Sequence, residues 1–258
     1  MSHQFGNRAS VLWDVNGGTG ADCIGHGTQV ASAVGGATHG VAKGATLIVA
    51  KITSGCTGNS DTATWALAFN WLAANAPRGT IVNLSSGLSY GLNQCTYTAY
   101  VQAVEDAIVA AFNAGIIVVV AAGNDNCNTI NFTPTRIPQA FVVGATDTSR
   151  LANGRDAKAS FSRTGTNIST FAPGQTVPLL NFDGAPITNS GTSFSAPYLA
   201  GMFAVGCQFY FPYCQDPLNS TGTIYEALRS VGTIGTVVNP DGTPLTGATS
   251  RFISRLVW

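Results

Sequence analysis

Charge is scarce in this 258-residue chain, and its scarcity excludes several classes of function. Only 9% of the residues are charged, and 12 basic residues balance 12 acidic ones. Soluble domains usually carry about 25% charged residues. The chain therefore lacks the basic surface that binds nucleic acid and the basic patch that binds an anionic membrane. Because 45% of the residues are hydrophobic and the net charge is zero, intrinsic disorder is disfavoured as well.

Long hydrophobic runs and metal-binding spacings are also absent. The longest apolar run, around residues 115–122, is far shorter than the roughly 20 residues that a membrane-spanning helix needs. No two cysteines stand in a CxxC pair, and the three histidines are not arranged with cysteines as a zinc site requires. We therefore expect no membrane span, no nucleic-acid partner and no metal ligands.

The cysteines point to a compartment. Six of them, an even number in a chain so poor in charge, predict disulfide bonds and an oxidising environment. The first residues, Met1 to Phe5, are polar and lack the hydrophobic segment of a signal peptide. The cysteine content thus indicates secretion, although the printed N-terminus carries no secretion signal.

The order of segments predicts the fold class. No internal repeat and no linker long enough to separate domains occurs, so residues 1–258 are expected to form a single domain. Strand-like and helix-like segments alternate: strands are predicted at 9–15, 46–52, 80–85, 116–121 and 141–145, and helices at 26–34, 62–76, 99–114, 192–209 and 223–231. This alternation predicts an α/β fold with a mostly parallel sheet, whose functional loops gather beyond the carboxyl ends of the strands.

Three of these junctions carry side chains suited to catalysis. His26 lies between glycines at a helix N-terminus, where positive charge is unfavourable, so a neutral imidazole can act there as a base. Ser193 opens the long helix, whose free N–H groups favour a developing oxyanion, and Asn124 can donate to one from the end of the most buried strand. Taken singly, each also has a structural interpretation: a histidine in a glycine turn, an N-cap serine and a strand-ending turn.

Taken together, in the order His, Asn, Ser on a parallel α/β frame, these junctions resemble the subtilisin-like serine proteases of peptidase family S8. The proteinase K-like branch is the most similar. Further segments match motifs of that family in order, namely 25–28, 40–42, 83–87, 121–124, 143–145, 171–174, 191–193 and 196–197. The resemblance covers residues 3–205, whereas 217–258 match only loosely. It implies a three-layer fold with a mostly parallel central sheet and helices on both faces.

The resemblance also implies a reaction. A serine endopeptidase would hydrolyse peptide bonds through an acyl-enzyme on Ser193, with His26 as general base and Asn124 in the oxyanion hole. An esterase of the α/β-hydrolase type is disfavoured, because that fold has the order Ser, Asp, His and needs a glycine where Ser195 stands.

Peptide-binding residues are carried over from the same motifs. Extended substrate would pair with segment 85–87 as an added strand, and the first pocket would lie between that segment and 121–123. Small residues in both walls predict an open, apolar pocket and a preference for large apolar side chains before the cut. The substrate-binding residues are therefore expected to be Ser85, Ser86, Gly87, Ala121, Ala122 and Gly123, with Gly58 at the opposite edge of the cleft.

One member of the family's catalytic triad is missing. The family carries its aspartate on the first strand, further before the histidine than the 25 residues that precede His26 here. The resemblance therefore implies that the domain is N-terminally incomplete, without its first strand. Asp14 and Asp22 are the alternative acids, although Asp22 is interpreted first as a loop residue that binds nearby backbone. Either the sequence is a fragment, with signal, propeptide and first strand upstream, or the protein is an inactive relative that binds peptides.

The remaining expectations concern disulfides and ligands. Cys23 and Cys56 resemble a known pair in bacterial proteinase K-like enzymes, and the other four cysteines are expected to pair as Cys95–Cys127 and Cys207–Cys214. No cofactor is required, and a structural calcium ion is doubtful because Ser169 stands where relatives often carry an aspartate. The resemblance implies an extracellular monomer whose partners are peptide or protein substrates and a propeptide or proteinaceous inhibitor.

Overall fold

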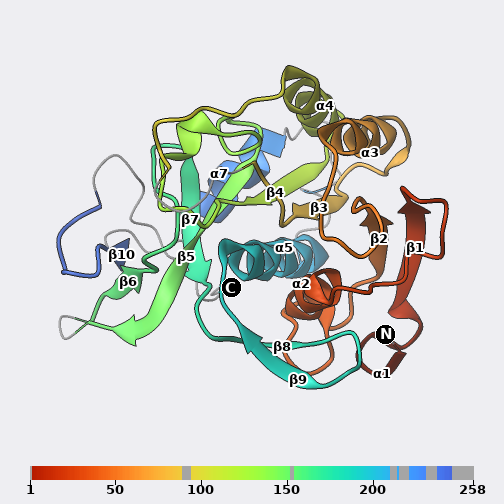
Figure 1. The fold of residues 1–258 in the computed structure, drawn as a ribbon, viewed down its shortest axis with the longest axis horizontal. Coiled ribbons are helices and arrows are strands. Elements are labelled where there is room, and N and C mark those ends of the chain that lie inside the picture. The colour runs from red at the N-terminus through yellow and green to blue at the C-terminus, as the bar shows by residue number, and fades with distance from the viewer. Residues whose placement is uncertain are drawn as a thin grey trace.

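A computed structural model describes residues 2–88, 94–151, 154–209, 214, 221–230 and 237–245 (Figure 1). The helices are α1 (Ser2–Phe5), α2 (His26–Gly35), α3 (Thr62–Asn75), α4 (Gln102–Asn113), α5 (Thr192–Phe209) and α7 (Thr221–Ser230), with short 3₁₀ turns η1 (Gly6–Arg8) and η2 (Thr129–Asn131). The strands are β1 (Ala9–Asp14), β2 (Leu47–Lys51), β3 (Ile81–Leu84), β4 (Ile117–Ala121), β5 (Phe141–Arg150), β6 (Asp156–Lys158), β7 (Ile168–Pro173), β8 (Val177–Leu180), β9 (Pro186–Asn189) and β10 (Val237–Val238).

Every strand and helix predicted from the sequence has a counterpart, and several further strands appear. Strands β7, β8 and β9 were not expected, and each of them contains a proline, a residue that is rare inside central strands. The β8–β9 hairpin closes through a turn in which Asn181 N–H donates to Ala185 O at 3.0 Å. Much of the loosely matching segment 217–258 lies outside the described residues.

Strand β4 is the centre of a three-layer core. All five of its residues are buried, and alternate side chains enter two different clusters. Val118 and Val120 pack in the cluster that includes residues of α3 and α4, whereas Ile117, Val119 and Ala121 pack in the cluster that includes residues of α5. Figure 1 shows α3 and α4 on one side of β4 and α5 on the other. A strand covered on both faces must be apolar throughout, which explains the unbroken hydrophobic run in the sequence.

The parallel ladder brings strand ends to one edge of the sheet. Strand β4 pairs in parallel with β3 on one side and β5 on the other, and β5 also pairs in parallel with β7. Leu84 lies opposite Val120, and Ala121 lies opposite Val143, so the loops after β3 and β4 leave the sheet side by side. The residues after Leu84 and after Ala121 are therefore neighbours.

A second, smaller sheet contains only β1 and β2. Within the part of the chain that the structure describes, β2 pairs with β1 alone and β3 pairs with β4 alone. Each of the two strands thus keeps one edge without a ladder partner. Free strand edges are positions at which a further strand can be added.

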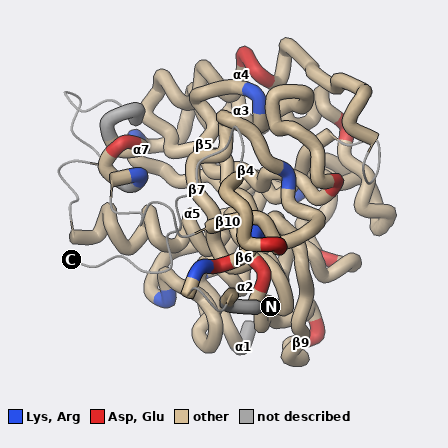
Figure 2. Tube along the Cα trace, turned by 90° about the vertical axis from the view of Figure 1, so that its left-hand side faces the viewer, with Lys and Arg blue, Asp and Glu red and all other residues tan. Residues whose placement is uncertain are grey.

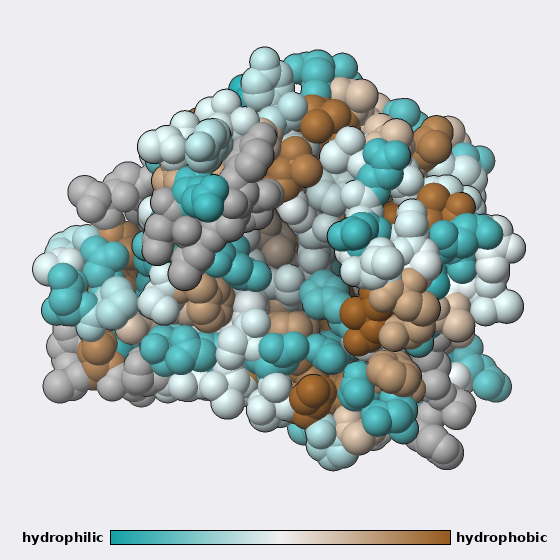
Figure 3. Space-filling view, viewed as in Figure 1, coloured by the Kyte–Doolittle hydropathy of each residue, from teal (hydrophilic) through white to brown (hydrophobic). Residues whose placement is uncertain are grey.

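The surface reflects the composition. Charged residues of both signs are sparse and spread out along the chain (Figure 2), and one face of the molecule shows hydrophobic residues in small separate groups among hydrophilic ones (Figure 3). No helix among the described residues is both long enough and apolar enough to cross a bilayer.

Tyr225 of α7 completes the hydrogen bonding of β4. Ile117 N–H donates to Thr80 O, so the peptide groups of Val118 point the other way, at a level where β5 has not yet begun. The Tyr225 hydroxyl accepts from Val118 N–H at 2.8 Å and lies 2.9 Å from Val118 O and 3.0 Å from Gln139 O, either of which accepts its proton. Burial raises the pKa of this hydroxyl well above its usual value near 10.

We expect Tyr225→Phe to lower the free energy of unfolding by about 1–3 kcal/mol, because it leaves buried peptide groups of β4 without a partner. Tyr198→Phe is the matched control, since the Tyr198 hydroxyl makes no hydrogen bond to any described residue. Urea unfolding of both variants measures the difference. The deficit should shrink above pH 10, where ionisation of Tyr225 in the unfolded state destabilises the parent and the Tyr198→Phe control but not Tyr225→Phe. Equal stability of the two variants would contradict this account.

Candidate active site

Ser193 lies in the first turn of α5, where the helix presents free backbone donors. Gly191, two residues before it, has a φ of +153°, a backbone conformation that favours glycine. Phe194 N–H bonds back to Gly191 O at 3.0 Å, whereas Ser193 N–H has no hydrogen-bond partner among the described residues. The serine hydroxyl is thus placed beside an available N–H group and the positive end of a helix dipole.

Asn124, which follows the end of β4, is held by Thr192. Its Oδ1 accepts hydrogen bonds from both N–H and hydroxyl of Thr192, each at 2.9 Å. The Thr192 hydroxyl also accepts from Gly123 N–H at 3.0 Å, so one side chain ties the strand end to the start of α5. With Oδ1 engaged in this way, the amide nitrogen of Asn124 is left to donate elsewhere.

Asn124 Nδ2 and Ser193 N border the same region of space, next to Gly191. A Cβ atom built on Gly191 would lie 3.4 Å from Asn124 Nδ2 and 3.7 Å from Ser193 N. Two donors that converge in this way can stabilise the oxyanion of a tetrahedral intermediate. Glycine at position 191 keeps that region free of side-chain atoms.

His26 begins helix α2 and lies next to the serine helix. Its ring centroid is 5.8 Å from that of Phe194, the residue after Ser193. Gly25, in the left-handed conformation at φ +96°, is the N-cap of this helix. The residue is exposed at the surface, but neighbouring atoms partly desolvate the ring, which lowers the pKa below 6.5, while the Asp22 carboxylate acts to raise it. The imidazole is therefore neutral at pH 7 and able to accept a proton.

Neither alternative acid reaches His26. Both oxygens of Asp22 cap helix α2: Oδ1 accepts from the N–H groups of Ile24 and Gly25, and Oδ2 accepts from N–H and hydroxyl of Thr28 at 2.8 and 2.6 Å. Burial raises the pKa of Asp22, but these hydrogen bonds outweigh it and hold the pKa below its usual value. Among the described residues, His26 makes no hydrogen bond to a carboxylate or to Ser193.

Asp14 is committed to a different loop. Its Oδ1 accepts from the backbone and side-chain nitrogens of Asn16, at 2.8 and 2.9 Å. Its Oδ2 accepts from Gly20 N–H at 2.9 Å. Asp14 therefore organises the turn after β1 and does not orient the imidazole.

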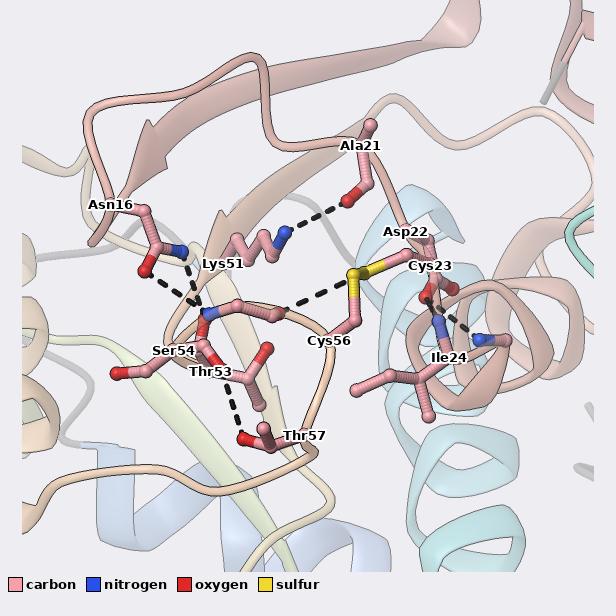
Figure 4. The surroundings of a disulfide bond; sticks show 12 residues. Asn16, Ala21, Asp22, Cys23, Ile24, Lys51, Thr53, Ser54, Cys56 and Thr57 are labelled. Carbon is pink, nitrogen blue, oxygen red and sulfur yellow. Dashed lines mark hydrogen bonds between the residues drawn. A yellow bond between two sulfur atoms is a disulfide. The ribbon is translucent and has the colours of Figure 1, made fainter.

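A disulfide fixes the loop that precedes His26. Cys23 bonds Cys56, and Lys51 Nζ donates to Ala21 O at 2.9 Å, so the loop after β2 is joined to the loop before α2 (Figure 4). The other disulfides are Cys95–Cys127 and Cys207–Cys214, and all three pairings are those expected from the sequence. A Cβ built on Gly58 would lie 3.7 Å from Ile24 Cδ1, which places Gly58 against this same loop.

A cavity of about 320 Å³ opens beside Ser193. Segment 85–88 lines it on one side and segment 121–125 on the other; the complete lining is Ser85, Ser86, Gly87, Leu88, Ala121, Ala122, Gly123, Asn124, Asp125, Arg163, Thr192 and Ser193. All six residues expected in the two pocket walls are present. Gly58, expected at the opposite edge of the cleft, does not line this cavity.

Two further lining residues were not predicted from the sequence. They are Asp125 and Arg163, whose side chains are only 2% and 1% exposed. Asp125 directly follows Asn124, a signal that could have been noticed. Arg163 lies far along the chain in a segment without a strong pattern, and only the fold places it here.

Ser85 has a structural role in addition to its place in the wall. Its hydroxyl donates to Ser193 O at 2.7 Å and accepts from Asn83 Nδ2 at 2.9 Å, which anchors the serine helix to the end of β3. The backbone N–H and C=O groups of residues 85–87 make no hydrogen bonds with other described residues. These peptide groups are free to pair with an extended chain.

The surroundings of Ser169 do not fit a calcium ion. The Ser169 hydroxyl accepts a hydrogen bond from Val142 N–H at 3.2 Å and one from the Arg229 guanidinium at 3.1 Å. The guanidinium supplies a positive charge beside this hydroxyl. The residues that the structure describes include no group of three or more His, Cys, Asp or Glu side chains that could hold a metal.

Comparison with known proteins relates this geometry to a protein family. A profile of the subtilase family matches residues 8–225. The extracellular serine proteinase of Thermus sp. (strain Rt41A) is 36% identical over 236 residues, which cover 90% of this chain and 53% of the relative. Alkaline protease 1 of Emericella nidulans is 34% identical over 248 residues, covering 93% and 56%. The chain thus spans about half the length of these relatives.

Solved structures agree with this relationship. A cold-adapted subtilisin-like serine proteinase has a TM-score of 0.84 to this chain at 29% identity, covering 99% of this chain and 84% of the other. A psychrophilic protease, S41, has a TM-score of 0.77 at 21% identity, covering 96% and 91%, and supports the fold alone. The three-layer architecture is that of subtilisin-like proteinases.

We expect removal of calcium to leave the stability of this chain unchanged, because Arg229 supplies the positive charge beside Ser169. Thermal unfolding with excess EDTA and with added calcium should give the same melting temperature. Arg229→Met should lower it, since the variant loses the ion pair with Glu226 and the hydrogen bond to Ser169. A melting temperature that falls in EDTA and recovers with calcium would contradict this interpretation.

Proposed function

The chain belongs to the subtilase family, and on that premise we propose that it hydrolyses internal peptide bonds through an acyl-enzyme on Ser193. The observation that carries the proposal is the convergence of Asn124 Nδ2 and Ser193 N–H on one region, beside a neutral His26. An oxyanion site next to a nucleophile and a base is the arrangement that acyl transfer requires.

The reaction would take place in two halves. Ser193 Oγ attacks the carbonyl carbon while its proton passes to His26, and the oxyanion forms between Asn124 and Ser193 N–H. The C–N bond then breaks, and His26 returns the proton to the leaving amine. A water molecule then attacks the ester carbonyl while it gives a proton to His26. The C–O bond to Ser193 breaks, the acid product leaves, and His26 returns the proton to Ser193 Oγ. No cofactor takes part.

Substrate recognition would rest on the main chain. The free peptide groups of residues 85–87 offer a strand edge, and pairing with a strand edge reads backbone rather than side chains. The cavity between segments 85–88 and 121–125 takes the side chain before the cut, with a preference for apolar residues. Peptides and unfolded proteins outside the cell are the substrates that we propose, with a propeptide or inhibitor seated in the same cleft and the enzyme acting as a monomer.

The acid that orients His26 would come from a segment outside the printed sequence. The carboxylate oxygens of Asp14 and Asp22 already accept hydrogen bonds from nearby donors, and neither carboxylate contacts the imidazole. The unpaired edges of β2 and β3 offer a place for a further strand. Removal of the triad acid from subtilisin, a member of this family, lowers kcat by about 10⁴-fold. We therefore expect the 258-residue chain by itself to have a low kcat.

The second candidate function is peptide binding without catalysis. It is favoured by one observation, that no described carboxylate contacts His26. An aspartate in an Asp-Thr-Gly or Asp-Ser-Gly motif upstream in the gene would argue for the protease, and its absence would argue for the binding module.

We expect the printed chain to cleave a chromogenic tetrapeptide with an apolar last residue slowly, and Ser193→Ala to abolish that cleavage. Extending the chain upstream to include an Asp-Thr/Ser-Gly segment should raise kcat by about 10³–10⁴-fold, because the imidazole then gains its orienting carboxylate. Initial rates of all three proteins, after circular dichroism shows that each is folded, measure the effect. Equal rates with serine and alanine at position 193 would sink the proposal.

The rate should also depend on pH through His26. Because burial lowers the pKa of His26, the basic form is already present at pH 7, and kcat/KM should fall only as the pH drops through a value below 6.5. Asp22→Asn removes the charge that raises this pKa, so the acidic limb should move to lower pH while kcat changes less than about tenfold. Asp14→Asn is the control and should leave the limb in place. A loss of about 10⁴-fold in Asp22→Asn would instead identify Asp22 as the triad acid.

A further inference from the structure

The cavity beside Ser193 contains a buried ion pair that the proposed reaction does not use. Arg163 Nε donates to Asp125 Oδ1 at 2.6 Å and Nη2 donates to Oδ2 at 2.5 Å, a two-point contact between planar groups. The side chains are only 1% and 2% exposed. Arg163 Nη2 also donates to Leu88 O at 2.7 Å, and its guanidinium carbon lies 3.6 Å from the centroid of the Phe132 ring.

The pair stands directly behind the walls of the cavity. Leu88 ends one wall, and Asp125 ends the other, immediately after the oxyanion residue Asn124. A Cβ built on Gly123 would lie 2.5 Å from Arg163 Nε, so a glycine in the wall is what lets the guanidinium lie against the backbone there. Asp125 and Arg163 both line the cavity, although their side chains are almost completely buried behind its surface.

Stability does not account for the pair. A buried ion pair loses hydration on both groups, and its replacement by apolar residues of similar volume is often neutral or stabilising. By contrast, a carboxylate in the pocket that receives the residue before the cut selects lysine or arginine, as it does in trypsin. Asp125 has the position for such selection, and Arg163 already occupies its two oxygens.

We propose that Arg163 is a specificity-determining residue: it neutralises Asp125 and thereby excludes lysine and arginine at the position before the scissile bond. The inference rests on the proposed function, since it concerns the side chain that the cavity receives. A basic side chain that enters the cavity finds the carboxylate already paired with a fixed guanidinium. Apolar side chains meet a pair with no net charge, so they are not excluded on this ground.

Binding tests the inference without relying on turnover. Isothermal titration calorimetry would measure the binding of four tetrapeptide amides to the Ser193→Ala variant. The peptides differ only in their last residue, which is Phe, Gln, Lys or Glu. The Phe peptide should bind more tightly than the Lys peptide. In a background with Arg163→Met, which keeps an unbranched apolar stem and removes the charge, the Lys peptide should bind about 10- to 100-fold more tightly than before.

Two variants control for charge and for folding. The neutral double variant, Arg163→Met with Asp125→Asn, should lose the gain for the Lys peptide because no carboxylate remains. Asp125→Asn alone leaves the guanidinium unpaired and should strengthen binding of the Glu peptide by about tenfold or more. If Arg163→Met does not fold, Asp125→Asn carries the test by itself.

The outcomes separate this inference from the proposed reaction. An unchanged ratio of Lys to Phe binding in folded Arg163→Met, or no gain for Glu in Asp125→Asn, overturns the role of Arg163 even if Ser193 turns over substrate. Binding of none of the peptides overturns it as well. The expected gains for the Lys peptide in Arg163→Met and for the Glu peptide in Asp125→Asn support the role of Arg163 even if the chain shows no Ser193-dependent cleavage. In that case the cavity belongs to a peptide-binding protein.

Discussion

The bridge made by Thr192 is the interaction on which the site depends. Its hydroxyl accepts from Gly123 N–H and donates to Asn124 Oδ1, so a single side chain fixes the end of the most buried strand to the start of α5. The two proposed oxyanion donors, Asn124 Nδ2 and Ser193 N–H, come from these two elements. Because β4 is packed between helices on both faces, the bridge connects these donors to the most tightly packed part of the core.

Three carboxylates near the cleft each hold a separate part of the structure in place. Asp22 caps the helix that carries His26, Asp14 closes the turn after β1, and Asp125 neutralises Arg163. In each case the carboxylate oxygens accept hydrogen bonds from nearby donors. Rotating such a carboxylate toward a new partner would break these hydrogen bonds. For the proposed reaction, the acid that orients His26 is therefore expected to be a residue other than these three.

Local signals account for what the sequence predicted, and long-range contacts account for what it did not. The buried run 117–121 is a local signal and predicted a strand of the parallel sheet, as the glycines around His26 predicted a turn before a helix. Tyr225 satisfies Val118 across 107 residues, and Arg163 reaches Asp125 across 38, and neither contact leaves a pattern in the chain. Prolines at strand ends concealed β7 and β9, because proline usually argues against a strand.

When a cleft binds substrate mainly through the main chain, its selectivity among substrates depends on the pocket that receives a side chain. Pairing along residues 85–87 supplies affinity that is nearly the same for every sequence, so differences among substrates arise where a side chain is buried. An apolar wall discriminates weakly between apolar side chains of similar size, by about 1–3 kcal/mol for each methylene. A charged wall discriminates strongly, because an unpaired buried charge is so costly. With its carboxylate and guanidinium paired, the proposed pocket would offer a lysine or arginine side chain no free carboxylate.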